Sequence, residues 1–213
     1  MGQLKNGPFS GFTGRTGSLV GYRRLGKWIM AAVKATAPRD PSLLQQYNSI
    51  RFTLFVEWLS WISEFIKVGF QAYATDMSAM NAAVRYNLDN AVTGVAPAFT
   101  IDYPKVMLSR GKLAQAYQLS MATTTDAQLD FSWTMNIGTW RGSDTDEAAF
   151  IVYDPTKADF AISMGEVTRE DLAFDMALPA LWSGDSVYVY MAFVSPDGKQ
   201  VSSSEYVGTT VVQ

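Results

Sequence analysis

Apolar side chains recur every three or four residues between positions 43 and 70, and this spacing predicts one long amphipathic helix. Asp40 and Pro41 precede the run and suit the N-cap and the first helical position, so we expect the helix to begin there and to end near Phe70. Its expected apolar face consists of Leu44, Tyr47, Ile50, Leu54, Phe55, Trp58, Leu59, Ile62, Phe65 and Ile66.

The second half of this segment, FTLFVEWLSWISEFIKVGF at 52–70, is the part of the chain closest to a membrane span in composition. Glu57, Glu64 and Lys67 lie inside it, and a charge near the centre of a bilayer costs about 2.5 to 3.5 kcal/mol. We therefore expect a helix that spans no membrane. Trp58 and Trp61 are three residues apart; this favours a core position, with Trp61 toward the flank, where it could line a surface.

A second, shorter helix is predicted over 77–91, capped by Asp76 or Ser78 and ended by Gly94. Alanines in this segment would let it lie close against the long helix. Its expected core positions are Met77, Met80, Val84 and Leu88.

The remaining segments predict strands. Two apolar-rich runs within 17–34 flank Leu25-Gly26, which favours a β-hairpin with a tight turn. From residue 99 the pattern alternates, with two strands predicted around Arg110-Gly111. Further strands are predicted with turn signals between them, over 128–135, 147–154, 160–167, 171–178, 186–196 and 200–212. About seven short strands at this spacing are typical of a β-sandwich.

The predicted fold class is therefore α+β. A glycine-rich N-terminal β-hairpin arm and two packed helices would occupy 1–114, and a β-sandwich with its own core would occupy 115–213.

Charge is distributed unevenly along the chain. Residues 1–39 hold seven cations and no acid, whereas residues 40–213 hold ten cations and twenty acids. The basic end of one molecule could attract the acidic part of a second copy, because opposite charges steer association. The alternative is a solvated basic hairpin on an acidic body.

The chain contains no cysteine and no histidine. Thiolate chemistry is therefore impossible, and the commonest general base and metal ligand are missing. We expect a protein without enzymatic activity and without a cofactor.

Two groups of acids are the remaining candidates for acid-base chemistry: Asp144, Asp146 and Glu147, and Glu166, Glu170, Asp171 and Asp175. Two carboxyls about 5 to 5.5 Å apart would suit a retaining glycosidase, but acids beside turns are usually solvated turn residues. The first group could also bind Ca²⁺ weakly, although it lacks the spacing of an EF-hand loop.

The N-terminal arm combines glycines, cations and aromatic side chains. A phosphate-binding loop would need a strand before it and a helix directly after it, and neither is predicted. Cations interleaved with aromatics also suit nucleic acid, but the sequence pI of about 5.0 makes this partner unlikely. We expect the arm to form an assembly interface through Arg15, Tyr22, Arg23, Arg24, Lys27 and Trp28.

Several sequence blocks carry a resemblance to a known family. They are LKNGPFSGFTGRTGSLVGYRRLGKWIMAA, QYNSIRFTLFVEWLS, YNLDNAVTG, IDYPKVMLSRGKL and FSWT, in this order. Together they resemble an uncharacterised family of Bacteroidota proteins known as a domain of unknown function. The family brings no established activity, so the resemblance implies no catalytic residue.

Two shorter likenesses accompany this one. The opening glycines, VGYRRLGK and the helix start LLQQYNSIRF are similar to short prophage-associated proteins; Gln46, Arg51 and Phe52 keep that pattern and Tyr47 departs from it. The part from AQLDFSWTM to YVGTT is similar to fibronectin type III or immunoglobulin-like modules. That likeness implies a core position for Trp133 and for a later-strand tyrosine, either Tyr188 or Tyr190.

We therefore expect a structural or assembly protein that associates with itself or with another structural protein. The alternative is a carbohydrate- or protein-binding module that uses sandwich loops and exposed aromatics such as Trp140 and Trp182. The start of the chain shows no secretory signal, which leaves the cytoplasm or export by a non-classical or phage-like route.

Overall fold

The structure, a computed structural model, describes residues 2–4, 11–33, 40–135 and 141–213. The chain divides into two compact units, Met1–Leu43 and Leu44–Gln213. Each unit is described by itself.

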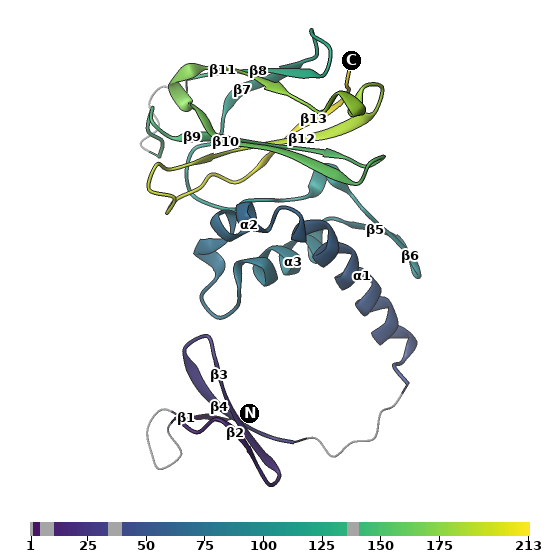
Figure 1. Cartoon of the computed structure of the whole chain (residues 1–213), viewed down its shortest axis with the longest axis vertical. Coiled ribbons are helices and arrows are strands. Elements are labelled where there is room, and N and C mark those ends of the chain that lie inside the picture. Colours follow the sequence, from purple (N-terminus) through teal and green to yellow (C-terminus); the bar gives the residue numbers. More distant parts are fainter. Residues whose placement is uncertain (1, 5–10, 34–39, 136–140) are drawn as a thin grey trace. The chain divides into compact units, whose positions relative to one another are not determined.

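The first unit contains an antiparallel four-stranded sheet (Figure 1). Its strands are β1 (Gly2–Leu4), β2 (Gly14–Thr16), β3 (Leu19–Arg24) and β4 (Lys27–Ala32), in the order β1-β4-β3-β2. The predicted hairpin is confirmed as its centre, with Leu25 and Gly26 in the turn at φ values of 47° and 76°. A two-residue turn with positive φ at both positions matches the twist of the strands. β1 and β2, which the sequence pattern did not indicate, extend the hairpin on both sides.

The second unit begins with helices. The predicted long helix is two helices, α1 (Leu43–Ser60) and α2 (Ser63–Gly69), and α1 begins later than Asp40. The chain tightens between them, where the Ile62 amide donates to the Leu59 carbonyl at 3.2 Å. A short 3₁₀ turn, η1 (Gln71–Tyr73), follows α2. The expected apolar face is buried from Phe55 onward, whereas the N-terminal turns of α1 leave Leu44 and Ile50 exposed.

The second predicted helix is confirmed as α3 (Ala79–Asn90). Ser78 is its N-cap, and the Ser78 side chain accepts a hydrogen bond from the Asn81 amide. Ala83 and Val84 are buried in the core that α3 shares with α2.

The two strands predicted around Arg110-Gly111 do not pair with each other, so that part of the prediction is wrong. β5 (Val92–Val95) pairs with β6 (Ala98–Ile101), and a short 3₁₀ turn, η2 (Tyr103–Lys105), follows. Residues 106–116 contain no extended strand and run alongside the end of the sandwich, where Leu113 bridges to Ser202. Gly111 permits this path, because a Cβ there would lie 1.8 Å from the Val201 carbonyl oxygen.

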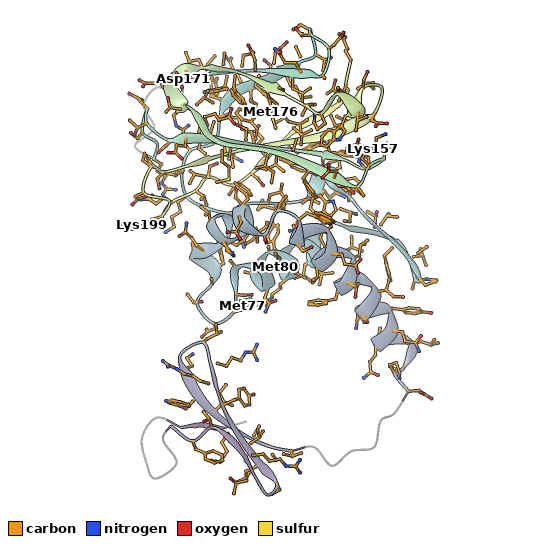
Figure 2. The ribbon with its side chains drawn as sticks, in the orientation of Figure 1. Met77, Met80, Lys157, Asp171, Met176 and Lys199 are labelled. Carbon is orange, nitrogen blue, oxygen red and sulfur yellow. The ribbon has the colours of Figure 1, made fainter. Side chains whose placement is uncertain are left out.

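Seven antiparallel strands form the predicted β-sandwich. One sheet has the order β11-β8-β7 and the other β10-β9-β12-β13. The strands are β7 (Tyr117–Ala122), β8 (Gln128–Thr134), β9 (Glu147–Asp154), β10 (Asp159–Thr168), β11 (Ala173–Ala177), β12 (Ser186–Val194) and β13 (Glu205–Val211), with the short 3₁₀ turns η3 (Arg169–Asp171) and η4 (Ala180–Trp182) between them. Met176 and Trp133 belong to the core between the two sheets, and Figure 2 shows Met176 there. The predicted α+β class with a C-terminal Ig-like β-sandwich is confirmed, because antiparallel sheets of three and four strands enclose a common core.

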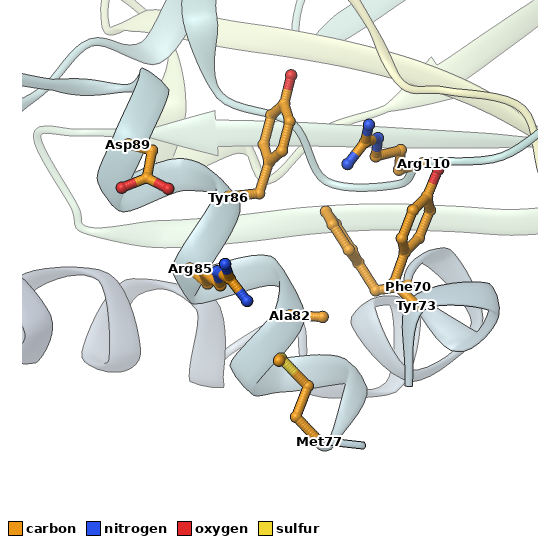
Figure 3. Close-up of a pocket in the computed structure, with 8 residues that line it drawn as sticks. All are labelled: Phe70, Tyr73, Met77, Ala82, Arg85, Tyr86, Asp89 and Arg110. Atoms are coloured by element: carbon orange, nitrogen blue, oxygen red, sulfur yellow. The ribbon is translucent and has the colours of Figure 1, made fainter. Parts of the chain in front are cut away.

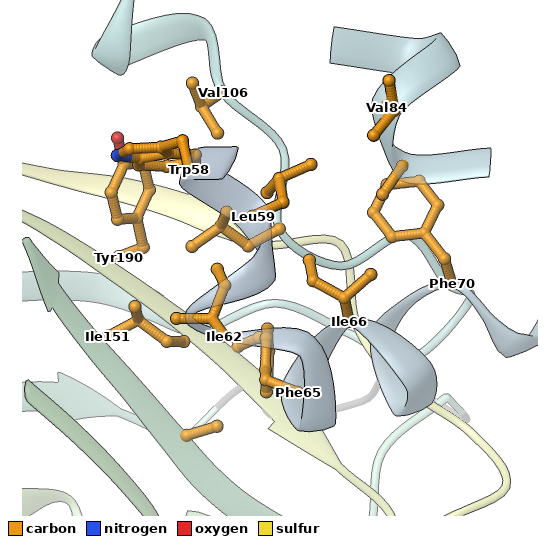
Figure 4. Packing of buried hydrophobic residues seen from close by; sticks show 14 of the residues in the cluster. Trp58, Leu59, Ile62, Phe65, Ile66, Phe70, Val84, Val106, Ile151 and Tyr190 are labelled. Atoms are coloured by element: carbon orange, nitrogen blue, oxygen red, sulfur yellow. The ribbon is translucent and has the colours of Figure 1, made fainter. Parts of the chain in front are cut away.

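The central strands of the four-stranded sheet of the sandwich, β9 and β12, are buried on both faces. In β9, Phe150 and Val152 face the other sheet, whereas Ile151 and Tyr153 face the helices. Ile151 packs there in one cluster with Ile62 and Phe65 (Figure 4). The predicted boundary between 114 and 115 therefore passes through a shared core, and the structure divides the chain near Leu43 instead.

None of the helices in the described part of the chain is long and apolar enough to cross a membrane.

Candidate functional site

The N-terminal sheet carries the six side chains predicted as an assembly interface. Residues directly opposite each other in an antiparallel pair share a face of the sheet. Tyr22 is opposite Ile29, Arg24 opposite Lys27, and Arg15 opposite Val20, which places all of these residues on one face. Arg23 and Trp28 are opposite each other on the other face. The strand register thus groups four predicted residues and separates two.

We call the first of these surfaces the cationic face; it consists of Arg15, Val20, Tyr22, Arg24, Lys27, Ile29 and Ala31. Three cations surround an apolar centre there. Arg24 and Lys27 are exposed, whereas Tyr22 and Ile29 are half-buried. Arg15 donates from Nε to the Gly17 carbonyl at 3.1 Å. This face offers positive charge around a small apolar surface.

The opposite surface is the aromatic face, which consists of Phe12, Leu19, Gly21, Arg23, Trp28, Met30 and Ala32. The Arg23 guanidinium lies 5.6 Å from the centre of the Trp28 ring, a cation-π contact. Phe12 packs on the backbone of Gly21, where a Cβ would come within 2.3 Å of Phe12 Cδ1. Any residue other than glycine at position 21 would displace Phe12.

Burial distinguishes this sheet from the rest of the protein. Of the first-unit residues whose burial the structure describes, Gly21 alone is buried. Trp28, Ile29 and Met30 are only half-buried, and Leu19 is 41% exposed. A sheet normally buries at least one apolar face, and the described residues of the first unit do not by themselves supply that cover.

Comparison with protein-family models gives one match that extends over most of the chain. The model of a family of unknown function, DUF6266, matches residues 11–208. The chain belongs to DUF6266. The matched range includes most of the N-terminal sheet and nearly all of the sandwich.

Two solved structures are similar to part of this DUF6266 chain. The fn3 domain of human collagen alpha-1(XX) chain is 13% identical with a TM-score of 0.36, covering 47% of this chain and 85% of that one. The fn3 domain of human contactin 1 is 5% identical with a TM-score of 0.29, covering 49% of this chain and 77% of that one. A search of curated proteins gives no match.

One acid of each predicted group of this DUF6266 chain, Asp146 and Asp171, serves the structure of the sandwich. Asp146 forms a buried ion pair with Arg169, with Nη2 3.1 Å from Oδ2. Sequence reasoning missed Arg169, whose guanidinium also donates to the Ala114 carbonyl and lies 3.7 Å from the centre of the Phe193 ring. Among the described residues, no three acids are grouped so that they could hold a metal ion.

Asp171 belongs to the second predicted acid group and forms a capping box. Its carboxylate accepts hydrogen bonds from the amide and the hydroxyl of Thr168. These bonds lower the pKa of the Asp171 carboxyl below its usual value. A side chain held in this way caps η3 and is a poor proton donor.

The tryptophans of the alternative prediction have different environments. Trp182 is 2% exposed and belongs to the sandwich core, so its prediction as an exposed ligand contact is wrong. It ends the turn η4 and packs in one cluster with residues of both sheets. Trp140 lies outside the described residues.

Trp61, by contrast, is 70% exposed. It lines a groove with a volume of about 320 Å³ between α1, the β5–β6 hairpin and β10. The groove is rich in aromatic side chains, namely Trp58, Phe99, Tyr103, Tyr153 and Phe160. The Trp58 indole N–H is buried and has no hydrogen-bond partner among the described residues.

Tyrosines cover the helix-facing side of the sandwich behind this groove. Tyr190 is fully buried and donates from its hydroxyl to the Tyr103 carbonyl at 2.8 Å, whereas Tyr188 is only partly buried. Tyr190 is therefore the core tyrosine of the later strand. Burial raises the pKa of Tyr103 and of Tyr190 well above the usual tyrosine value; for Tyr103 a hydrogen bond with Tyr153 adds to this shift.

Proposed function

We propose that this protein is a non-enzymatic structural or assembly protein that associates with a second copy of itself through its N-terminal sheet. The observation that carries the proposal is the burial of that sheet, in which Gly21 alone is buried among the residues whose burial is described. A four-stranded sheet whose faces are little buried within its own unit gains stability when a partner covers one of them.

Charge favours a second copy as the partner. The cationic face presents Arg24 and Lys27, and residues 40–213 carry twice as many acids as cations. Opposite charges on two surfaces of one chain favour head-to-tail contacts, which produce rings or filaments. From the resemblance of the sequence blocks we further infer an origin in Bacteroidota and a phage-like setting.

The test compares the two faces in the full chain. Arg24→Glu with Lys27→Glu reverses charge on the cationic face, and Arg23→Glu with Trp28→Ala changes the aromatic face. We expect light scattering to show an oligomer for the unchanged protein and a smaller species for the first variant. Added salt should also weaken association, because exposed charges are screened over about 8 to 10 Å.

The competing arrangement is a sheet that packs within its own chain. In that case the unchanged protein would be monomeric at all concentrations, and both variants would only lower its melting temperature. That result would refute self-assembly.

A second candidate function, a carbohydrate- or protein-binding module, rests on Trp61. An exposed indole beside a groove of about 320 Å³ offers a flat apolar surface of the kind that stacks on a sugar ring or packs against a side chain. Trp61→Ala would abolish binding of a glycan library and leave the oligomeric state unchanged. Absence of any glycan or protein ligand would rule this candidate out.

A further inference from the structure

Arg110 is held between two tyrosine rings in the helical part of the second unit. Its guanidinium carbon lies 4.5 Å from the centre of the Tyr73 ring and 5.0 Å from that of Tyr86. Figure 3 shows the guanidinium between these rings, with Tyr73 from η1 and Tyr86 from α3. Two cation-π contacts fix the position of the group.

The same guanidinium lacks an anionic partner. It makes neither an ion pair nor a hydrogen bond with any residue that the structure describes; only the Arg110 backbone amide is bonded, to the Gly69 carbonyl at 2.9 Å. Ring contacts use the flat faces of a guanidinium and leave the N–H donors in its plane unused. Those donors match the two oxygens of a carboxylate.

Arg110 lines a cleft with a volume of about 300 Å³. Phe70 and Met77 give this cleft an apolar part, and Arg85 supplies a second cation. Asp89 is the single acid among the lining residues, and Figure 3 places it at the opposite end of the cleft from Arg110. The cleft thus combines one apolar end with a fixed cation.

A second cleft, of about 500 Å³, shares Tyr73 as a wall with the first. Lys112 and Lys199 line it, and Lys199 also approaches Asp197 at 3.5 Å. The two clefts together hold four of the ten cations of residues 40–213, although that part of the chain is strongly acidic. This local excess of positive charge favours an anion.

We propose that the Arg110 cleft binds the carboxylate of a small organic acid with an apolar or aromatic body. Arg110 binds the carboxylate, Tyr73 and Tyr86 hold the guanidinium in place, and Phe70 and Met77 contact the apolar body. Arg85 adds attraction at longer range. All of these residues belong to the second unit, so the proposal does not rest on self-association.

Benzoate is the probe for the test, with benzamide as the uncharged probe of the same shape and inorganic phosphate as a different anion. We titrate each into the full chain and follow backbone and tyrosine resonances by NMR. The expected result is saturable benzoate binding with shifts at Arg110, Tyr73 and Tyr86, and at least tenfold weaker binding of benzamide. Arg110→Lys keeps the charge but not the planar donors, and should lose at least tenfold in affinity.

Arg24→Lys, on the N-terminal sheet, is the matched control and should bind benzoate as the unchanged protein does. Arg85→Gln with Lys112→Gln alters two exposed residues, so it tests the charge argument should Arg110→Lys fail to fold; a several-fold loss of affinity is expected. Three results would overturn the proposal: resonance shifts that do not saturate with benzoate, equal binding of benzoate and benzamide, or full benzoate affinity in both Arg110→Lys and the Arg85→Gln, Lys112→Gln double variant. Tighter binding of phosphate than of benzoate overturns the carboxylate assignment.

Discussion

The ring of Phe12 lies directly against the backbone of Gly21. Among the first-unit residues whose burial the structure describes, Gly21 alone is buried. Gly21→Ala would place its Cβ 2.3 Å from Phe12 Cδ1 and 2.5 Å from the Phe12 carbonyl oxygen. Phe12 and its backbone must then move, and we expect destabilisation of the sheet by about 1 to 3 kcal/mol. Hydrogen exchange of the amides in β2 and β3 measures this loss.

Val20→Ala, on the opposite face, is the control, because it removes methyl groups without displacing Phe12. The amides of β2 and β3 should exchange more slowly in Val20→Ala than in Gly21→Ala. A double-mutant cycle with Phe12→Ala tests the part played by the ring: the double variant lacks the clash with the ring and keeps the clash with the Phe12 carbonyl, so the two effects should be less than additive. Full additivity would contradict the packing argument.

The shared core makes a prediction about fragments of the chain. A fragment of 44–213 retains the helices that cover the outer face of β9 and β12, and should unfold in one cooperative transition. A fragment of 115–213 leaves Ile151, Tyr190 and Ala192 uncovered, and should aggregate or bind a hydrophobic dye. Circular dichroism melts and dye fluorescence compare the two.

Ile151→Thr with Ala192→Thr within the 115–213 fragment provides the control, since it makes the uncovered face more polar and should improve solubility. A soluble, cooperatively folding 115–213 fragment without these changes would restore the boundary predicted from sequence.

Asn87 connects α3 to the segment that leads into the sandwich. It is fully buried, donates to the Met107 carbonyl at 2.9 Å and accepts from the Met107 amide at 2.9 Å. Asn87→Ala leaves these buried groups unpaired and should lower the free energy of unfolding by about 1 to 3 kcal/mol. Urea denaturation measures the change.

Asn90 is the matched control on the same helix, because it is exposed and its side chain bonds, among the described residues, only to the Tyr86 carbonyl in the preceding turn. Asn90→Ala should change stability by about 0.5 kcal/mol or less. Equal losses for the two variants would contradict the role assigned to Asn87.

The hydroxyls of Tyr103 and Tyr190 should make the stability of the protein sensitive to alkaline pH. Burial raises the pKa of both hydroxyls in the folded state above the usual value of 10.0. The unfolded chain therefore releases these protons first, so their contribution to stability is complete below about pH 10 and falls as the pH rises beyond it. Urea midpoints at pH 8 and pH 11 should show this loss.

Tyr190→Phe should lose less stability between the two pH values than the unchanged protein, and Tyr117→Phe, at a 53% exposed position, should behave as the unchanged protein. Tyrosine absorbance provides the second measurement, since Tyr103 and Tyr190 should ionise only on unfolding. Identical pH dependence in all three proteins would contradict this prediction.

The local elements follow from the sequence, because their signals lie within a few residues of one another. Leu25-Gly26 predicts the hairpin turn, Ser78 predicts the start of α3, and the run at 147–154 predicts β9. The uninterrupted apolar stretch AAFIVY in β9 also indicates burial on both faces, because a strand buried on both faces lacks the alternation of apolar and polar residues.

Contacts between distant residues were decided by the tertiary structure. Arg169 meets Asp146 across 23 positions, and Arg110 enters the space between Tyr73 and Tyr86 because α3, η1 and the connection to the sandwich converge there. No periodicity encodes such meetings, since they depend on how whole elements pack. The composition determined the candidate groups of the N-terminal arm, whereas the strand register decided that Arg24 and Lys27 share one face and that Arg23 lies on the other.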